Sequence, residues 1–319
     1  MELESHSQTE KVSETVILPS WNPGASKRAL IDFVARVSLH DSPEFVPIPE
    51  RIAVFDNDGT LWAEKPLYMQ LAFVIDQIIA MAPQHPEWHD KEPFKSVIKG
   101  DIKAALADGK SSAAALLAVT HAGMSTEDFD KSARLWFQRA QHPQLKRPYT
   151  ELIYQPMLEL INFLRINGFK IFIASAGGAD FMRSVTEKLY GIPPEQVIGT
   201  TGKTRYEFHD GKPELIKLAE VDNFDEGPGK PASIHKFIGR RPLLAFGNSD
   251  GDYEMLEWVT SQDRPHLGLL LHHTDAEREW SYDRGSHVGK LNRALDAASR
   301  ARWILVDMKK DWKRVYPFH

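Results

Sequence analysis

The chain has 319 residues and a net charge of −5, and its shares of apolar (42%) and charged (26%) residues are those of an ordinary globular protein. Such a composition supports one large or two modest domains, and the lack of a long basic run argues against a nucleic-acid partner. The absence of cysteine excludes disulfides, thiolate catalysis and Cys-ligated metals.

The first residues are polar and lack the basic and apolar regions of a signal peptide. We expect residues 1–25 to form a flexible N-terminal segment. No apolar stretch reaches the ~18 residues of a membrane span. The sequence therefore predicts a soluble cytoplasmic protein with no membrane partner, or a periplasmic or secreted one if a signal peptide was removed.

Helical patterns surround one short strand in the first half of the chain. Ser26 is expected to cap a helix with one apolar face, and 51–55 forms a buried β-branched strand. From 66 to 147 the apolar periodicity is helical, and Ser125 begins a sequence typical of a capping box. About 80 residues are too many for a simple crossover, so 66–147 is predicted to be a helical cap subdomain.

After this insert, strands and helices alternate. A helix from about Pro156 ends at Asn167-Gly168, another is expected at 179–190, and Asp210-Gly211 is a strong hairpin signal. Strands separated by helices predict a doubly wound, Rossmann-like parallel sheet, an α/β core formed by 26–65 and 148–319. The apolar runs that predict buried strands lie at 170–174, 242–246, 266–271 and 303–307.

Polar and charged residues gather where these predicted strands end. The carboxyl ends of parallel strands meet at one edge of a sheet, so residues far apart in sequence can converge there. Carboxylate and amide oxygens suit Mg²⁺, whereas a hydroxyl, an ammonium and N–H groups of glycine-rich turns suit phosphate. The clusters are Asp56 with Asp58, Ser175, Lys230, and Asn248 with Asp252.

Such a set of groups can carry out phosphoryl transfer. A carboxylate attacks phosphorus and forms an acyl phosphate, which water then hydrolyses. Because a carboxylate and a phosphate repel each other, a cation and a lysine must screen their charges. A second carboxyl group can protonate the leaving alkoxide and later deprotonate the water.

The segment Asp56-Asn57-Asp58-Gly59-Thr60 resembles the first motif, D-x-D-G-T, of the haloacid dehalogenase (HAD) superfamily. The resemblance implies that Asp56 is the nucleophile and a Mg²⁺ ligand. It implies that Asp58 is the general acid and base, with its backbone carbonyl on the metal. Thr60 matches a residue that supports the metal ligands without touching the metal.

The later motifs of the superfamily follow in order, so that the resemblance covers roughly residues 50 to 310. Ser175 matches the phosphate-binding hydroxyl of the second motif, with the backbone of Ala176 and Gly177 beside it. Lys230 matches the phosphate-binding lysine of the third motif. The helical insert corresponds to the helical cap of the family.

The fourth motif departs from the usual pattern G-D-x-x-x-D. Asn248 stands where the family commonly has the first aspartate, and Asp252 matches the second. Asp250 lies between them, so it either supports the metal or caps the following helix. An amide carbonyl can still bind Mg²⁺ but brings no charge, and we expect Asn248 and Asp252 to be the ligands.

The Ser-Ala-Gly-Gly segment and the predicted hairpin resemble the phosphoserine-phosphatase-like branch of the superfamily. Glu64 falls near the position of a substrate-sensing glutamate in that branch, although the offset differs, so phosphoserine is not inferred as the substrate. Arg183, in the helix after Ser175, is a second candidate for substrate contact.

Several features also have ordinary structural explanations. A lysine such as Lys230, considered without the motifs, would be expected to be solvated at the surface. Lys203 and Lys212 are lesser candidates for the phosphate site.

Adjacent His272 and His273 invite a zinc interpretation. In an extended segment their side chains point to opposite faces, so packing and hydrogen bonding are the expected roles.

The sequence thus predicts a Mg²⁺-dependent phosphatase that hydrolyses a small phosphorylated metabolite through an aspartyl-phosphate intermediate. The alternative from another class is a non-catalytic HAD-fold protein that binds phosphate or a metabolite, an idea favoured by Asn248. Dehalogenase and phosphomutase activities are less favoured, since dehalogenases resembling this family lack an equivalent of Asp58. The sequence does not indicate the oligomeric state.

Overall fold

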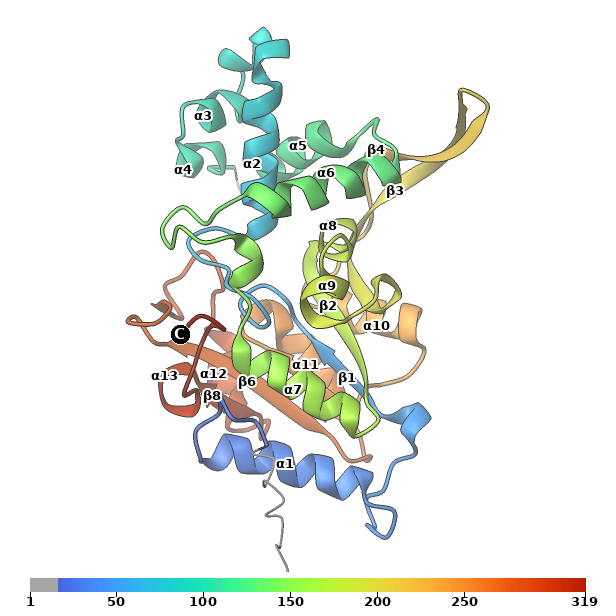
Figure 1. Ribbon diagram of the computed structural model, residues 1–319, viewed down its shortest axis with the longest axis vertical. Helices are drawn as coiled ribbons and strands as arrows, with labels where there is room; N and C mark the ends of the chain where they lie inside the picture. The colour runs from blue at the N-terminus through green and yellow to red at the C-terminus, as the bar shows by residue number, and fades with distance from the viewer. Residues whose placement is uncertain (1–16, 109) are drawn as a thin grey trace, which may run out of the picture.

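A central, mostly parallel sheet organises the computed structural model, which describes residues 17–108 and 110–319 (Figure 1). The strand order is β4-β3-β2-β1-β5-β6-β7, and β8 also pairs with β6. Only the β3–β4 and β6–β7 pairs are antiparallel. The strands are β1 (Ile52–Phe55), β2 (Lys170–Gly178), β3 (Val197–His209), β4 (Lys212–Asn223), β5 (Leu244–Gly247), β6 (Leu267–Thr274), β7 (Ser281–Tyr282) and β8 (Ile304–Asp307).

Helices cover both faces of this sheet. Successive side chains of β1 point to opposite sides, so that Phe55 joins the core beneath α1 (Ala25–Ser38) and α7 (Gln155–Ile166), whereas Val54 joins a second core. That second core includes side chains of α10 (Gly229–Ile238), α11 (Tyr253–Thr260) and α12 (Arg293–Ala298). The structure therefore confirms the predicted doubly wound α/β core.

Residues 66–147 form helices that lie together beyond one end of the sheet, at the top of Figure 1. No strand lies in the described part of this range, as the periodicity predicts. Ser125 caps the last of these helices, since its side chain accepts the backbone N–H of Asp128 at 3.0 Å. The helices are α2 (Met69–Met81), α3 (Phe94–Ile98), α4 (Ile102–Ala105), α5 (Lys110–His121) and α6 (Thr126–Arg139).

The hairpin of β3 and β4 joins the sheet to these helices. Its first residues pair in parallel with β2, and its later part extends toward α5 and α6 (Figure 1). There the backbone N–H of Lys217 donates to the carbonyl of Met124, and the N–H of Gly123 donates to the carbonyl of Lys217, both at 2.9 Å. These bonds fix the hairpin against the α5–α6 connection.

The remaining helices are short. They include α8 (Ala179–Arg183), α9 (Thr186–Tyr190) and α13 (Met308–Asp311), and 3₁₀ turns lie at Ile48–Glu50, Ala82–Gln84, Pro86–His89, Tyr149–Glu151, Pro194–Gln196 and Asp250–Asp252. Among the residues that the structure describes, no helix has the length and apolar character needed to cross a membrane.

Two local predictions are wrong. The helix expected at 179–190 is interrupted at Ser184 and Val185, where Val185 leaves helical geometry. Ser26 lies inside α1 rather than at its cap, which is Gly24, and its hydroxyl donates to Asp311 at 2.9 Å. The periodicity of apolar residues does not reveal a single non-helical backbone angle such as that of Val185. It also does not reveal a contact with a distant residue such as that of Ser26 with Asp311.

The predicted flexible segment, 1–25, divides into two parts. Residues 1–16 lie outside the described residues. Residues 17–24 are packed, because Leu18 and Trp21 are buried and the Trp21 indole donates to the carbonyl of Pro156 at 3.0 Å. The hydroxyl of Ser20 also donates to Glu159 at 2.6 Å. The prediction of flexibility is therefore wrong for residues 17–24.

Candidate active site

The predicted strand-end residues converge because β1 lies between β2 and β5 in the sheet. Residues from all three strand ends, and Lys230 from the first turn of α10, line one cavity of about 530 Å³. Its lining includes Asp56, Asp58, Ser175 and Lys230. The topology thus produces the juxtaposition that the motif order predicts.

A buried ion triad lies at the centre of the site. The Lys230 ammonium donates to Asp56 Oδ1 at 2.7 Å and to Asp252 Oδ1 at 2.5 Å. All three side chains are buried, and Lys230 is only 2% exposed. Burial disfavours the ammonium, but the two carboxylates outweigh this effect and raise the pKa of Lys230. Burial and the charge of Asp252 raise the pKa of Asp56, which the lysine opposes.

One oxygen of Asp56 is available for chemistry. Its Oδ1 accepts the lysine, while no described residue donates to its Oδ2. Asp252 differs, since its Oδ2 accepts the backbone N–H groups of Asn248 at 2.9 Å and Ser249 at 3.0 Å. Asp252 is therefore held in place by the turn after β5, and Asp56 is the less constrained carboxylate.

Asp58 lies beside the second motif. Its Oδ1 accepts the indole N–H of Trp62 at 2.8 Å. Gly177 lies against its other oxygen, since a Cβ at Gly177 would be 3.3 Å from Asp58 Oδ2 and 3.5 Å from Ser175 Oγ. Burial raises the pKa of Asp58 against the opposing effects of the Trp62 indole and the Lys230 charge. A carboxyl group with a raised pKa is suited to donating a proton.

The glycine of the first motif allows a close approach between segments. Gly59 has φ +72°, and a Cβ there would lie 2.1 Å from Asn248 Nδ2 and 2.4 Å from Glu64 Oε1. In this confined space the Asn248 amide donates to Glu64 Oε1 at 2.8 Å, and the Thr60 hydroxyl donates to Asn248 Oδ1 at 3.1 Å. Thr60 and Glu64 thereby fix the orientation of the Asn248 amide.

Glu64 is a buried member of the site and lines the cavity. It also accepts the Tyr282 hydroxyl at 2.8 Å. Burial raises the pKa of Glu64 to about 7, although His273 and Tyr282 oppose the shift. His273 is itself buried and contacts Glu279 at 3.0 Å and the Gly59 carbonyl at 2.8 Å, so it packs and hydrogen-bonds as expected.

Asp250 has a structural partner. Its Oδ1 accepts the backbone N–H groups of Asn292 and Ala294, both at 2.9 Å, at the start of α12. It also lines the cavity. The helix expected to use Asp250 as its cap begins instead after a 3₁₀ turn capped by Ser249. Asp250 therefore stabilises a helix, but a later one than the sequence suggests.

Other predicted residues lie elsewhere. The Arg183 guanidinium donates to the carbonyls of Pro194 at 3.1 Å and Val197 at 3.0 Å, so it fixes the entry to β3 and does not line the cavity. Lys203 is exposed on the hairpin and pairs with Glu220. Lys212 is exposed at the hairpin tip. Of the three lysine candidates, Lys230 alone lines the cavity.

Several residues that the fold brings to this cavity could not be predicted from the sequence. Tyr68 and Gln70 come from the start of α2, and Gly289 and Lys290 come from the loop before α12. Tyr282, on the two-residue strand β7, reaches the site through Glu64. No motif or periodicity marks these positions, because long-range packing alone brings them to the site.

The donor set suits Mg²⁺ in its chemistry, since it consists of carboxylate, amide and backbone oxygens. Among the described residues, no group of three or more acidic, His or Cys side chains is arranged as a metal site. The cation between Asp56 and Asp252 is instead the Lys230 ammonium. A metal ion held by both carboxylates would compete with this ammonium for their negative charge.

The family model of haloacid dehalogenase-like hydrolases matches residues 53–257. The chain belongs to this family. The match begins in β1 and ends in α11, so it includes all four motif positions and the inserted helices. A search of curated proteins gave no match.

Solved structures resemble this chain to different extents. A functionally unknown protein from Anaerococcus prevotii DSM 20548 has a TM-score of 0.51 at 16% identity, covering 78% of this chain and 85% of that one. A protein of unknown function from Bordetella pertussis Tohama I has a TM-score of 0.51 at 13% identity, with 81% and 99% covered. A phosphoserine phosphohydrolase-like protein from Francisella tularensis reaches 0.39 at 19% identity, with 70% and 88% covered. For the two structures with a TM-score of 0.51, at 16% and 13% identity, the likeness concerns the fold alone.

Proposed function

We propose that this HAD hydrolase is a Mg²⁺-dependent phosphatase that acts on phosphomonoesters of small metabolites through an aspartyl-phosphate intermediate. One observation carries the proposal. Asp56 presents a carboxylate oxygen without a partner among the described residues, next to a buried ammonium and to a second carboxyl group, Asp58. Nucleophile, phosphate-binding cation and proton donor thus share one cavity.

The residues have the following roles in this mechanism. Oδ2 of Asp56 attacks phosphorus, and the ester P–O bond breaks as the new P–O bond forms. The Ser175 hydroxyl, the backbone of Ala176 and Gly177, and the Lys230 ammonium bind the phosphoryl oxygens. Asp58 gives its proton to the departing alkoxide.

The second half of the reaction regenerates the protein. Asp58, now ionised, takes a proton from water as the water oxygen attacks phosphorus, and the Asp56 carboxylate leaves. The residues that would hold Mg²⁺ are Asp56, Asn248, Asp252 and the backbone carbonyl of Asp58. When bound, the metal would supply positive charge that reduces the repulsion between carboxylates and phosphate.

The helices of 66–147 fit the role of a cap in this proposal. Tyr68, Gln70, Leu71 and Leu117 from these residues line the cavity together with the motif residues. A cap in this position limits the access of water to the reacting groups and selects the alcohol part of the substrate. The division into an α/β core and a helical cap is thus part of the proposed function.

The proposal is tested by phosphate release from a panel of phosphomonoesters, with Mg²⁺ and with EDTA. We expect release only with Mg²⁺. We expect Asp56→Asn to lower kcat by about four orders of magnitude or more, because it removes the nucleophile. Asp263→Asn changes an exposed aspartate and is the matched control.

Two results would contradict the assignment. If Asp56→Asn retained activity, Asp56 would not be the nucleophile. If the wild-type protein bound phosphate but released none from any ester, the protein would be a binding module, the alternative that Asn248 favours.

A further inference from the structure

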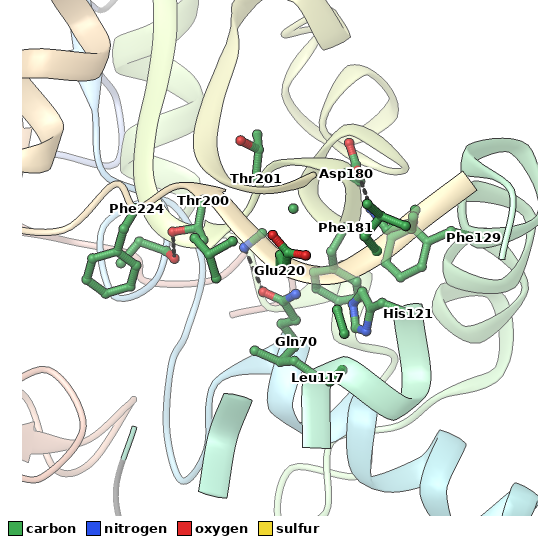
Figure 2. Close-up of a pocket in the computed structure, with 18 residues that line it drawn as sticks. Gln70, Leu117, His121, Phe129, Asp180, Phe181, Thr200, Thr201, Glu220 and Phe224 are labelled. Atoms are coloured by element: carbon green, nitrogen blue, oxygen red, sulfur yellow. Dashed lines mark hydrogen bonds and ion pairs between the residues drawn. The ribbon is translucent and has the colours of Figure 1, made fainter. Parts of the chain in front are cut away.

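A second pocket opens beside the catalytic cavity. It has a volume of about 370 Å³ and lies between α2, α5 and α6 on one side and α8 and the β3–β4 hairpin on the other (Figure 2). We propose that it binds an uncharged, apolar group of the substrate, so that the preferred substrates are phosphomonoesters of alcohols with an apolar group about the size of one ring. This inference rests on the proposed phosphatase function and names its substrate class.

The two cavities adjoin each other, since Gln70, Leu117, Ala176 and Phe224 line both. Ala176 directly follows Ser175, the proposed phosphate-binding hydroxyl. A phosphoryl group held at Ser175 therefore leaves its ester oxygen near this shared boundary. The rest of the alcohol can extend past it into the second pocket.

Gln70 provides a hydrogen-bond donor at the boundary. Its Oε1 accepts the backbone N–H of Gly178 at 2.7 Å, which fixes the amide, and no described residue accepts from its Nε2. Figure 2 shows Gln70 between the end of the pocket at Phe224 and Thr200 and the end at His121 and Phe129. An amide donor at this point suits the ester oxygen of a bound substrate.

Apolar side chains dominate the second pocket. Three aromatic rings contribute, with Leu117 on one side, as Figure 2 shows. Rings and aliphatic side chains favour an apolar ligand because they remove its surface from water without requiring polar partners. Besides Ala176, the apolar lining residues are Leu117, Ala118, Phe129, Phe181, Leu218, Ala219, Val221 and Phe224.

The charged residues of the lining already have partners of opposite charge. Lys217 pairs with Asp180 and lies 4.7 Å from the centre of the Phe129 ring. Glu220 pairs with Lys203 at 2.6 Å. Burial lowers the pKa of His121 to about 4, so its imidazole is neutral at pH 7. Among the residues that the structure describes, this lining offers no unpaired counter-charge to an ammonium or a carboxylate of the substrate, which disfavours an amino-acid phosphate.

The walls of this pocket are fixed before a ligand binds. The backbone hydrogen bonds that join Lys217 to Gly123 and Met124 hold β4 against the end of α5. The Phe73 ring stacks on Phe181 at 5.3 Å and meets Phe129 edge to face at 5.9 Å. Because the pocket is preformed, ligand binding does not include the loss of conformational entropy that ordering its walls would require.

The test compares methyl phosphate with benzyl phosphate, two esters with alkoxide leaving groups. For the wild-type protein with Mg²⁺, we expect kcat/KM to be about 30-fold higher for benzyl phosphate, since burial of the ring contributes to binding. Ala118→Phe and Ala219→Phe fill the pocket from its two sides. We expect each to remove most of this preference and to leave methyl phosphate turnover unchanged.

The control is Ala104→Phe, which changes an exposed alanine of α4 that lines neither cavity. A second readout is calorimetric binding of both esters to Asp56→Asn with Mg²⁺, which requires no turnover. If both esters are hydrolysed with equal efficiency, or if both filled variants keep the preference, the apolar subsite is refuted and the phosphatase proposal stands.

The phosphatase proposal can fail separately. If neither ester is hydrolysed, but benzyl phosphate binds more tightly and the filled variants lose this difference, the pocket assignment stands and the proposed activity is wrong. If neither hydrolysis nor a difference in binding is found, both proposals are overturned.

Discussion

Replacing Lys230 with methionine tests the electrostatics of the site. The ammonium lies 2.7 Å from Asp56 Oδ1 and 2.5 Å from Asp252 Oδ1, and the three side chains are buried. Lys230→Met roughly preserves the volume of the side chain but leaves two buried carboxylates without their cation. Breaking a buried ion pair in this way costs about 3–5 kcal/mol. With an unfolding entropy of about 0.7 kcal/mol/K for 319 residues, Tm should fall by about 4–7 °C.

The assay is thermal unfolding at pH 8 in EDTA, followed by circular dichroism. Lys236→Met removes an exposed lysine of the same helix, and we expect it to change Tm by less than about 1 °C. Adding Mg²⁺ should raise Tm more for Lys230→Met than for the wild type, because the metal no longer competes with the ammonium for the two carboxylates. A loss in EDTA no larger than that of Lys236→Met would refute the reasoning.

Two further predictions concern stability. Gly59→Ala should lower the free energy of unfolding by about 2–4 kcal/mol, because Gly59 has a positive φ and a Cβ there would overlap Asn248 and Glu64. Urea unfolding measures this loss. Gly211→Ala, also at positive φ but in open space, measures the part of the loss that comes from backbone strain alone. Asp225 is fully buried, and burial raises the pKa of its carboxyl group from 3.8 to about 6 against the charge of Lys230 and the hydroxyl of Ser233. Since the folded state holds this proton more tightly, stability is lost as pH rises from about 4 to 6. Asp225→Asn should therefore be more stable than the wild type by about 3 kcal/mol at pH 8 and by about half as much at pH 5. Urea unfolding in EDTA at both pH values, with exposed Asp222→Asn as the control, checks this; an equal gain at both would contradict it.

The strands that carry the motifs and the identity of the central residues could be predicted from the sequence. Short apolar runs that end in charged or glycine-rich turns define the parallel strands, and parallel strands place their ends together. For this reason Asp56, Asp58, Ser175 and Lys230 could be assigned to one cavity before any coordinates. Family membership, which the motifs indicated, agrees with the match over residues 53–257.

The partners of these residues could not be predicted in the same way. Asp250 interacts with the start of α12, and Arg183 with the entry to β3, because each side chain met an acceptor or donor that is distant in sequence. The position of Glu64 near the first motif makes it a candidate, but its burial against Asn248 and Tyr282 depends on the packing of three separate segments.

The sequence by itself determined which reactive side chains the protein carries and that they follow the ends of strands, because motif spacing at strand ends is a local property of the chain. The tertiary structure alone decided the surroundings of that chemistry. The second pocket exists because the β3–β4 hairpin packs against α5 and α6. The sequence pattern of the hairpin does not indicate this contact, and the patterns of the two helices do not indicate it either. Contacts between distant segments depend on the whole fold, and in this protein they define the pocket to which we assign substrate selection.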